Sequence, residues 1–503
     1  MKEKKDFIVA GILVVTVFLF FLITGTLTSG FHFVDDHEVI KIKNDFNGSS
    51  FLNVTKDWVK EDLHNNGRFR PLYYIYRVAE TKIFGSDFTL WSIHNGVLLC
   101  IALLLFYFGM RHMKFQILES LAALIIIFTG PQSSVWWRLG PGESLGMVLL
   151  GFSFYLISNT DRIRNYHLNN LLFALFLILS SLTKESFLII VPAMIVLKVW
   201  NDKINLWGSF KISVTRNLIL VAPLVVIVIE LGIIKYYVGT AYADLDSNLI
   251  NNLKLVFSAS WHFIRSYLNL IIAGIIIMVT SRIARKPVKS PNLFSIIFFL
   301  LILVPNIVLY SRTGLVERYL LPSSFGLAFL VVIFLSQIED NKGWFKKTAL
   351  ILIILSFLPA FAKTFVEARK FSKEGEDTKE LFSTISLNHV NGTNVMLVVD
   401  PVESYEYSVS MKTYLKYENQ IDLYGYCILP IENQEANQSY VDGWKSYFTG
   451  RQLENLTKKP ELLIFLDKLK VDEFFSASVL LQKDYQSIEL GNTPYALFKE
   501  VIR

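Results

Sequence analysis

The sequence predicts an α-helical polytopic membrane protein of about eleven transmembrane helices, with a small α/β domain at its C-terminal end. Three observations predict this class. Of the 503 residues, 52% are hydrophobic, and the mean hydropathy of +0.42 lies above the range of soluble proteins. Long apolar runs recur up to about residue 366, and the composition then becomes charged and polar. We therefore divide the chain into a transmembrane domain, 1–366, and a soluble domain, 367–503.

Each predicted span is an apolar run that approaches the length a bilayer requires, about 20 residues. The first run follows Met1-Lys2-Glu3-Lys4-Lys5, and no small-residue cleavage site comes after it, so we expect a retained helix rather than a signal peptide. The candidate spans are residues 7–27, 88–110, 117–135, 143–158, 168–182, 186–200, 217–237, 257–280, 293–310, 319–337 and 348–364.

The lysines and arginines of the short loops predict the orientation. With the N-terminus in the cytoplasm, the inner segments hold 18 of these residues and the four short outer loops with their flanks hold six. An odd number of spans then leaves the C-terminal domain outside the cytoplasm. We expect an integral protein of the plasma membrane, or of the endoplasmic reticulum membrane if the source is a eukaryote.

Charge and cysteine content exclude two classes of protein. The net charge of +6 is the excess that inner loops of a membrane protein carry, so it does not predict nucleic-acid binding. Cys100 and Cys427 fall in different predicted domains, so no disulfide framework is expected.

The first outer loop, residues 28–87, is too long to be a simple connection. It opens with Asp35-Asp36-His37-Glu38 directly after the first span, where charge is costly to desolvate. One interpretation is an acid/base centre; the other is a helix end in water. From Tyr73 to Glu80, apolar and aromatic residues recur at helical spacing, which predicts a helix in the plane of the membrane interface.

The C-terminal domain shows two buried-strand patterns, at residues 394–400 and 462–467. The stretch 405–417 between them has helical character. No glycine-rich phosphate loop and no metal-ligand spacing are present in this part of the sequence.

Under this topology, many ionisable residues near the membrane fall on the outer side. Each also has a structural interpretation: a surface ion pair, a snorkelling arginine, a charged first turn of a helix, contact with lipid headgroups, or a core histidine. They are Asp35, Asp36, His37, Glu38, Arg68, Arg70, Arg138, Glu143, Lys184, Glu185, His262, Arg265, Arg312, Glu317 and Arg318.

Together, these residues predict a cavity that combines carboxylates with several cations. Arginine and lysine at the outer leaflet suit an anionic phosphate, and a nearby carboxylate suits deprotonation of an acceptor hydroxyl. The chemistry indicated is displacement of a phosphate leaving group from a lipid-linked sugar, in which the cations stabilise the charge that develops on the phosphate.

Five motifs carry a resemblance to a known family. They are the acidic pair after the first span, Gly67-Arg68-Phe69-Arg70-Pro71-Leu72, Gly142-Glu143-Ser144-Leu145-Gly146, Thr183-Lys184-Glu185-Ser186, and Glu317-Arg318-Tyr319-Leu320-Leu321-Pro322-Ser323. In this order they resemble the C-type glycosyltransferase superfamily (GT-C), and within it the O-mannosyltransferase-like and aminoarabinose-transferase-like proteins. The resemblance covers roughly residues 7–340.

The resemblance implies roles for particular residues. Asp35 or Asp36 would be the catalytic base, and Arg68, Arg70, Lys184 and Arg318 would bind the donor phosphate. Some members of the superfamily need a divalent metal, but the acidic stretch here supplies too few oxygens for a hard cation, so no cofactor or metal is expected.

The expected function is transfer of a sugar from a polyprenyl-phosphate donor to a surface glycan, lipid or protein on the outer face of the bilayer. Two alternatives remain open. A transporter or flippase for a lipid-linked glycan would also need a basic cavity, but the internal repeats typical of transporters are not evident. A non-catalytic scaffold would use the 367–503 domain as its binding module.

Overall fold

The computed structural model describes residues 2–160, 165–202, 218–238, 249–283, 293–313, 317–338, 344–389, 394–399, 404–427, 459–477 and 482–501. The chain forms two compact units. The first comprises Met1–Thr24, Thr55–Arg77 and Ser92–Ala368, and the second comprises Gly25–Val54, Val78–Trp91 and Arg369–Arg503. The predicted 367–503 domain did not include the two loop segments that the second unit takes from the first outer loop.

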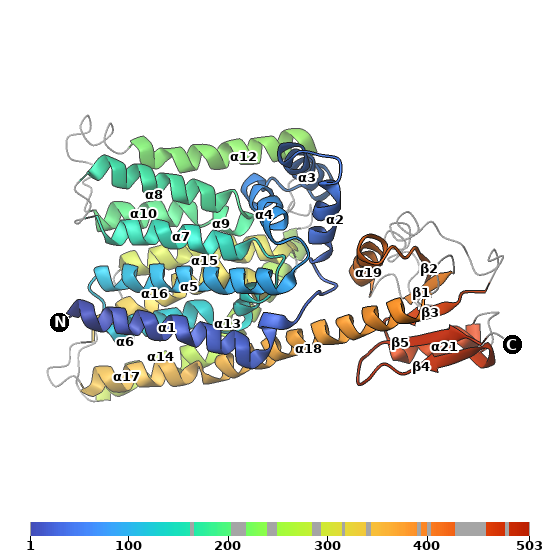
Figure 1. Cartoon of the computed structure of the whole chain (residues 1–503). Helices are drawn as coiled ribbons and strands as arrows, with labels where there is room; N and C mark the ends of the chain where they lie inside the picture. Colours follow the sequence, from blue (N-terminus) through green and yellow to red (C-terminus); the bar gives the residue numbers. More distant parts are fainter. Residues whose placement is uncertain are drawn as a thin grey trace. The chain divides into compact units, whose positions relative to one another are not determined.

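The first unit is a bundle of apolar helices that run side by side (Figure 1). Within the described residues, six helices are long and apolar enough to cross a membrane, or seven if one bent pair counts as a span. The protein is therefore an integral, mostly helical membrane protein, as its hydropathy predicted. The six long helices match the predicted spans 7–27, 88–110, 217–237, 293–310, 319–337 and 348–364. They run over Lys4–Thr24, Phe88–His112, Leu218–Tyr237, Leu293–Ser311, Arg318–Ser336 and Trp344–Asn388.

The other five predicted spans take different forms. Three are shorter apolar helices: α6 (Ile117–Phe128), α7 (Glu143–Ser158) and α8 (Tyr166–Ser181). The run 186–200 forms two pieces, α9 (Glu185–Leu188) and α10 (Val191–Asn201). The run 257–280, predicted as one span, bends by 65° between α13 (Leu249–Ser266) and α14 (Leu268–Ile283).

The remaining helices complete the bundle and lead into the second unit. The helix predicted around Tyr73–Glu80 is present as α4, and its place in the membrane interface stays a prediction. The bounds are α1 (Lys2–Thr24), α3 (Phe51–Asn66), α4 (Pro71–Phe84), α5 (Phe88–His112), η2 (Pro131–Trp136), η3 (Leu218–Val221), α12 (Ala222–Val238), α15 (Leu293–Thr313), η4 (Glu317–Leu320), α16 (Leu321–Ser336), α17 (Trp344–Ser356) and α18 (Leu358–Asn388).

Aromatic rings fill the centre of the bundle. Phe106, Phe154, Phe325 and Phe329 are fully buried and contact one another across α5, α7 and α16. Gly146 allows two helices to come close, since it has no side chain. A methyl group at this position would lie 2.4 Å from the Phe187 ring. This close approach brings the start of α7 against α9, where the candidate site lies.

The second unit is built on a five-stranded mixed sheet of order β2-β1-β3-β5-β4. The two strands predicted from apolar runs are present as β1 (Val395–Val399) and β3 (Leu462–Phe465), and the predicted helix is α19 (Tyr405–Glu418). Strand β1 pairs in parallel with β2 and β3, and β5 is antiparallel to β3 and β4. The other elements are η1 (Thr26–Thr28), α2 (His37–Asp45), β2 (Leu423–Cys427), η6 (Lys468–Lys470), α21 (Val471–Ala477), η7 (Gln482–Asp484), β4 (Tyr485–Ile488) and β5 (Ala496–Glu500).

Candidate functional site

The first turn of α7 and the break before α9 bring two predicted site residues into contact. Lys184 Nζ donates to Glu143 Oε1 at 2.5 Å, and both side chains are buried. Glycine allows this approach, since a methyl group at Gly142 would lie 2.8 Å from the Tyr73 ring and 3.3 Å from the Thr183 carbonyl oxygen. The motif glycines thus let α7 start directly beside the Thr183-Lys184 turn.

An aromatic platform from another pair of elements lies against the same lysine. Lys184 Nζ is 4.5 Å from the ring centre of Tyr319, and the Arg318 guanidinium is 5.5 Å from the same ring. Tyr319 also stacks on Tyr310, with ring centres 4.6 Å apart. Cations placed over an aromatic face are stabilised by the ring quadrupole, so this platform holds two cations at one position.

A third cation approaches from the first outer loop. Arg68 Nε lies 3.7 Å from Glu185 Oε1, and both side chains are mostly buried. Arg68, Lys184 and Tyr319 all line one small cavity of about 10 Å³, which has room for about one water molecule. The full lining is Arg68, Lys184, Glu185, Ser186, Leu309, Tyr310 and Tyr319. We call these residues, with Glu143 and Arg318, the Lys184 cluster.

Arg70, which was expected to bind phosphate, is engaged with a carboxylate of its own loop. Its Nε and Nη2 donate to the two oxygens of Asp62, each at 2.8 Å. Burial alone would lower the pKa of the guanidinium, but the Asp62 carboxylate raises that pKa well above its ordinary value. The ring of Tyr73 lies 4.8 Å from the guanidinium and completes its surroundings. Asp62 was not singled out in the sequence.

The acidic pair of the first outer loop lies in the second unit. Asp36 immediately precedes α2 and is buried, and its Oδ2 accepts from the backbone N–H of His32 at 2.9 Å. His32 Nδ1 lies 3.5 Å from the same oxygen, and its Nε2 is 2.9 Å from the Phe371 carbonyl oxygen. Because a carbonyl can only accept, Nε2 carries a proton. Asp36 thus stands at the N-terminal end of α2, but it is buried rather than in water and its side chain does not cap the helix.

Asp35 differs from its neighbour in both backbone and exposure. Its φ of 70° lies in the left-handed region, which few residues other than glycine adopt. Its side chain is partly exposed, and its backbone N–H donates to Glu406 Oε1 at 3.2 Å. His37 and Glu38 follow as the first residues of α2, both partly exposed.

The remaining predicted residues lie in other surroundings. Arg138 is part of the turn between η2 and α7, where its carbonyl oxygen accepts from Asn95 at 2.8 Å. His262 and Arg265, on α13, line a separate cavity that shares no residue with the Lys184 cluster. The side chains of Arg312 and Glu317 lie outside the described part of the chain.

Two tyrosines and a lysine that line these cavities were not predicted from the sequence. Tyr319 stood within a motif that was read only for its charges, and Tyr310 had no signal beyond its place near the end of an apolar run. Lys363, which lines the cavity with His262 and Arg265, falls at the end of the last predicted span. Among the described residues, no three His, Cys, Asp or Glu side chains are grouped closely enough to hold a metal ion.

Comparison with known proteins identifies the fold. The crystal structure of ArnT from Cupriavidus metallidurans bound to undecaprenyl phosphate matches 98% of this chain and 98% of its own, with a TM-score of 0.52 and 10% identity. The chain has the ArnT fold. The apo structure of the same ArnT matches 100% of this chain and 99% of its own, with a TM-score of 0.48 and 13% identity. No protein-family model and no curated protein sequence matches the chain.

The likeness to ArnT confirms the predicted GT-C resemblance at the level of the fold. ArnT is an aminoarabinose transferase of the GT-C class, and its fold extends over almost the whole of both chains. At this identity the match assigns no role to any individual residue.

Proposed function

We propose that this protein is a membrane glycosyltransferase that takes a sugar from a polyprenyl-phosphate donor. One observation carries the proposal: the chain shares its fold, over nearly its full length, with an ArnT that was crystallised with undecaprenyl phosphate. The acceptor would be a glycan, lipid or protein at the cell surface. The three shorter apolar helices, the α9–α10 run and the bent pair would complete about eleven crossings, with the N-terminus in the cytoplasm and the C-terminal domain outside.

The Lys184 cluster is the proposed site of the donor phosphate. The cations Arg68, Lys184 and Arg318 lie near the carboxylates Glu143 and Glu185, so a phosphate at this place would meet three cations. The cavity is small because the carboxylates already hold the cations, and a phosphate would compete with them. When the bond to the sugar breaks, the same cations would stabilise the negative charge that develops on the phosphate. Arg70, through its ion pair with Asp62, would hold the first outer loop in position.

Asp35 or Asp36 is the proposed base. The carboxylate would take the proton of the acceptor hydroxyl as that oxygen attacks the anomeric carbon. The bond from this carbon to the phosphate oxygen would break, and the electron pair would leave with the polyprenyl phosphate. Asp35 is the more accessible of the two, and Asp36 is the more firmly held.

The test is transfer by purified protein reconstituted with a polyprenyl-phosphate sugar and a cell-envelope acceptor. Asp35→Asn and Asp36→Asn are compared with Asp45→Asn, an exposed carboxylate of α2 that should leave transfer unchanged. Loss of at least about a hundredfold in one of the two, with normal folding, supports the base assignment. Full transfer by both variants would overturn it.

The bent pair α13 and α14 favours a second candidate function, because discontinuous helices are common in transporters. A flippase would move the lipid-linked glycan across sealed vesicles and release no polyprenyl phosphate. Release of polyprenyl phosphate in detergent, where no second compartment exists, would exclude a transport-only role. Restoration of a null phenotype by the C-terminal domain alone would instead favour a scaffold.

A further inference from the structure

Helix α12 carries a single carboxyl group, that of Glu230, within an apolar segment. The segment Leu218–Tyr237 is long and apolar enough to cross a membrane. Val228, Ile229 and Leu231 are exposed on this helix, whereas Glu230 is buried. An ionisable side chain in such a segment is costly to keep and commonly has a function, so the partner of Glu230 is informative.

This partner is the hydroxyl group of Ser181, the last residue of α8. Glu230 Oε1 lies 3.2 Å from Ser181 Oγ, and the same Oγ lies 2.8 Å from the Ile178 carbonyl oxygen. A hydroxyl group has one hydrogen, which the shorter contact assigns to the carbonyl. Ser181 Oγ is then left to accept a hydrogen bond, and Glu230 can donate one only as the neutral acid. Burial favours the same form, because no cation of the described residues forms an ion pair with this carboxyl group.

The residues on both sides of this serine are anchored to other helices. Ser180 Oγ donates to the Gly146 carbonyl oxygen, in α7, at 3.0 Å. The Leu182 carbonyl oxygen accepts from the backbone N–H of Leu72, in α4, at 3.2 Å. With the contact from α12, three helices hold three consecutive residues of one turn. Lys184 follows two residues later, so its place in the Lys184 cluster depends on how this turn is held.

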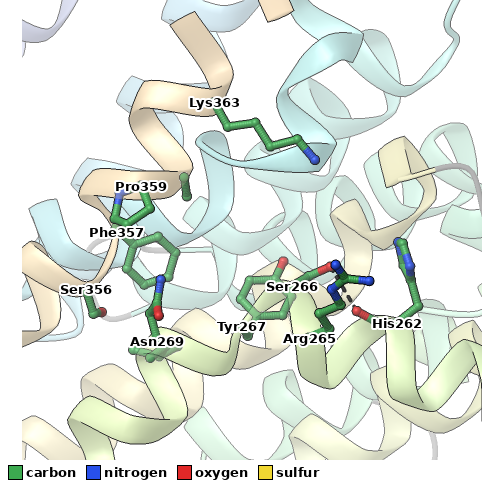
Figure 2. Close-up of a pocket in the computed structure, with 11 residues that line it drawn as sticks. His262, Arg265, Ser266, Tyr267, Asn269, Ser356, Phe357, Pro359 and Lys363 are labelled. Carbon is green, nitrogen blue, oxygen red and sulfur yellow. Dashed lines mark hydrogen bonds between the residues drawn. The ribbon is translucent and has the colours of Figure 1, made fainter. Parts of the chain in front are cut away.

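Glu230 influences a ligand through this turn rather than by contact. The described residues that line the small cavity of the Lys184 cluster do not include Glu230, and neither do those of the cavity of about 410 Å³ beside α13 (Figure 2). We propose that Glu230 is a positioning residue for Lys184: its neutral carboxyl group donates to Ser181 and fixes the turn between α8 and α9. The inference rests on the proposed phosphate site at the Lys184 cluster.

The first test follows Lys184 directly and does not depend on catalysis. The full chain in phosphatidylcholine nanodiscs is treated briefly with acetic anhydride, and mass spectrometry gives the acetylation rate of Lys184. Glu230→Leu should raise this rate about threefold or more, since loss of one buried hydrogen bond opens the turn more often. Glu230→Gln keeps a donor, and Lys235→Gln is the matched control at an exposed position of α12, so both should leave the rate unchanged. An unchanged rate in Glu230→Leu would overturn the proposal.

The second test is kinetic and adds Ser181→Ala, which removes the same contact from α8 and serves if Glu230→Leu folds poorly. In both variants KM for the polyprenyl-phosphate sugar should rise about three- to tenfold, with a smaller change in kcat, and Glu230→Gln should restore it. A lower thermal midpoint with unchanged KM and unchanged acetylation would show a merely structural role and overturn the proposal. If the unsubstituted protein transfers no sugar, the proposed function fails, and the acetylation rates still decide how Lys184 is positioned.

The third test reads the protonation of Glu230. The infrared difference spectrum between the unsubstituted protein and Glu230→Gln at neutral pH should contain the C=O stretch of a protonated carboxyl group. The same difference for Asp45→Asn, an exposed carboxylate, should contain the bands of an ionised carboxylate instead. Carboxylate bands in the Glu230→Gln difference would overturn the assignment of Glu230 as a neutral donor. Circular dichroism and thermal unfolding confirm that each variant is folded.

Discussion

Lys184 and Glu143, which are 41 residues apart in the chain, form a buried ion pair with 2.5 Å between Nζ and Oε1. A buried pair contributes little net stability, because desolvation offsets most of the attraction, but removal of one partner leaves the other charge buried and unpaired. In the proposed function, a phosphate would exchange for the Glu143 carboxylate as the partner of Lys184.

Glu143→Gln should destabilise the protein. It should also increase the thermal stabilisation that a phosphate ligand gives. Loss of one partner of a buried pair costs about 3–5 kcal/mol of unfolding free energy, and the freed ammonium of Lys184 then lacks its carboxylate. Undecaprenyl phosphate should raise the thermal midpoint of Glu143→Gln more than that of the unsubstituted protein.

Glu119→Gln is the control for that variant. It breaks the Glu119–Lys346 pair, in which the carboxylate is also buried and Nζ lies 2.6 Å from Oε1. This control should also be destabilised, but its response to undecaprenyl phosphate should equal that of the unsubstituted protein. An equal response in both variants would show that Lys184 does not bind the phosphate.

Arg70→Lys should lower stability even though it keeps the charge. Lysine cannot reproduce the two parallel bonds from Arg70 to Asp62, and loss of such a bidentate pair costs about 1.5–3 kcal/mol. A double-mutant cycle with Asp62→Asn, measured by chemical unfolding in detergent, should give a coupling energy of this size. Lys43→Gln, which breaks an exposed pair with Glu418, should change stability by less than about 1 kcal/mol. Additivity of Arg70→Lys and Asp62→Asn would contradict the role of this pair.

Gly146→Ala should disturb the approach of α7 to α9. The added methyl group would lie 2.4 Å from the Phe187 ring, and overpacking of this kind costs about 1–3 kcal/mol. Because the displaced helix carries Glu143, phosphate binding at the Lys184 cluster should weaken as well. Gly232→Ala is the matched control in helix α12: nothing lies within 4 Å of its added methyl group, so it should be neutral or slightly stabilising. A Gly146→Ala protein as stable as the control would refute the close packing.

Asp35 and Asp36 should respond differently to substitution. Asp35→Gly removes the side chain from a left-handed backbone position, so stability should stay the same or rise by up to about 1 kcal/mol. Asp36→Ala leaves the buried N–H of His32 without its acceptor, which costs about 1–3 kcal/mol. Unfolding of the full chain, followed by circular dichroism, gives both values. If Asp35→Gly is the less stable variant, the assignment of structural roles to this pair is wrong.

Much of the helical architecture could be predicted because it depends on local composition. Six predicted spans coincide with long apolar helices, and the two apolar runs near residues 395 and 462 form the adjacent parallel strands β1 and β3. The bend between α13 and α14 could not be predicted, since neither glycine nor proline occurs between Phe263 and Leu270 to mark it. The break at Phe357 had a local signal in Pro359.

The sequence by itself determined that the protein is a mostly helical membrane protein, where six of its long apolar helices lie, and which ionisable residues stand at segment ends. These properties follow from the free energy of transferring each residue out of water, which acts along the chain. Only the tertiary structure decided the partners: Lys184 pairs with Glu143 and not with its neighbour Glu185, and Arg70 with Asp62. The physical reason is that an ion pair depends on a separation of a few ångströms, and helix packing around residues such as Gly142 and Gly146 sets that separation.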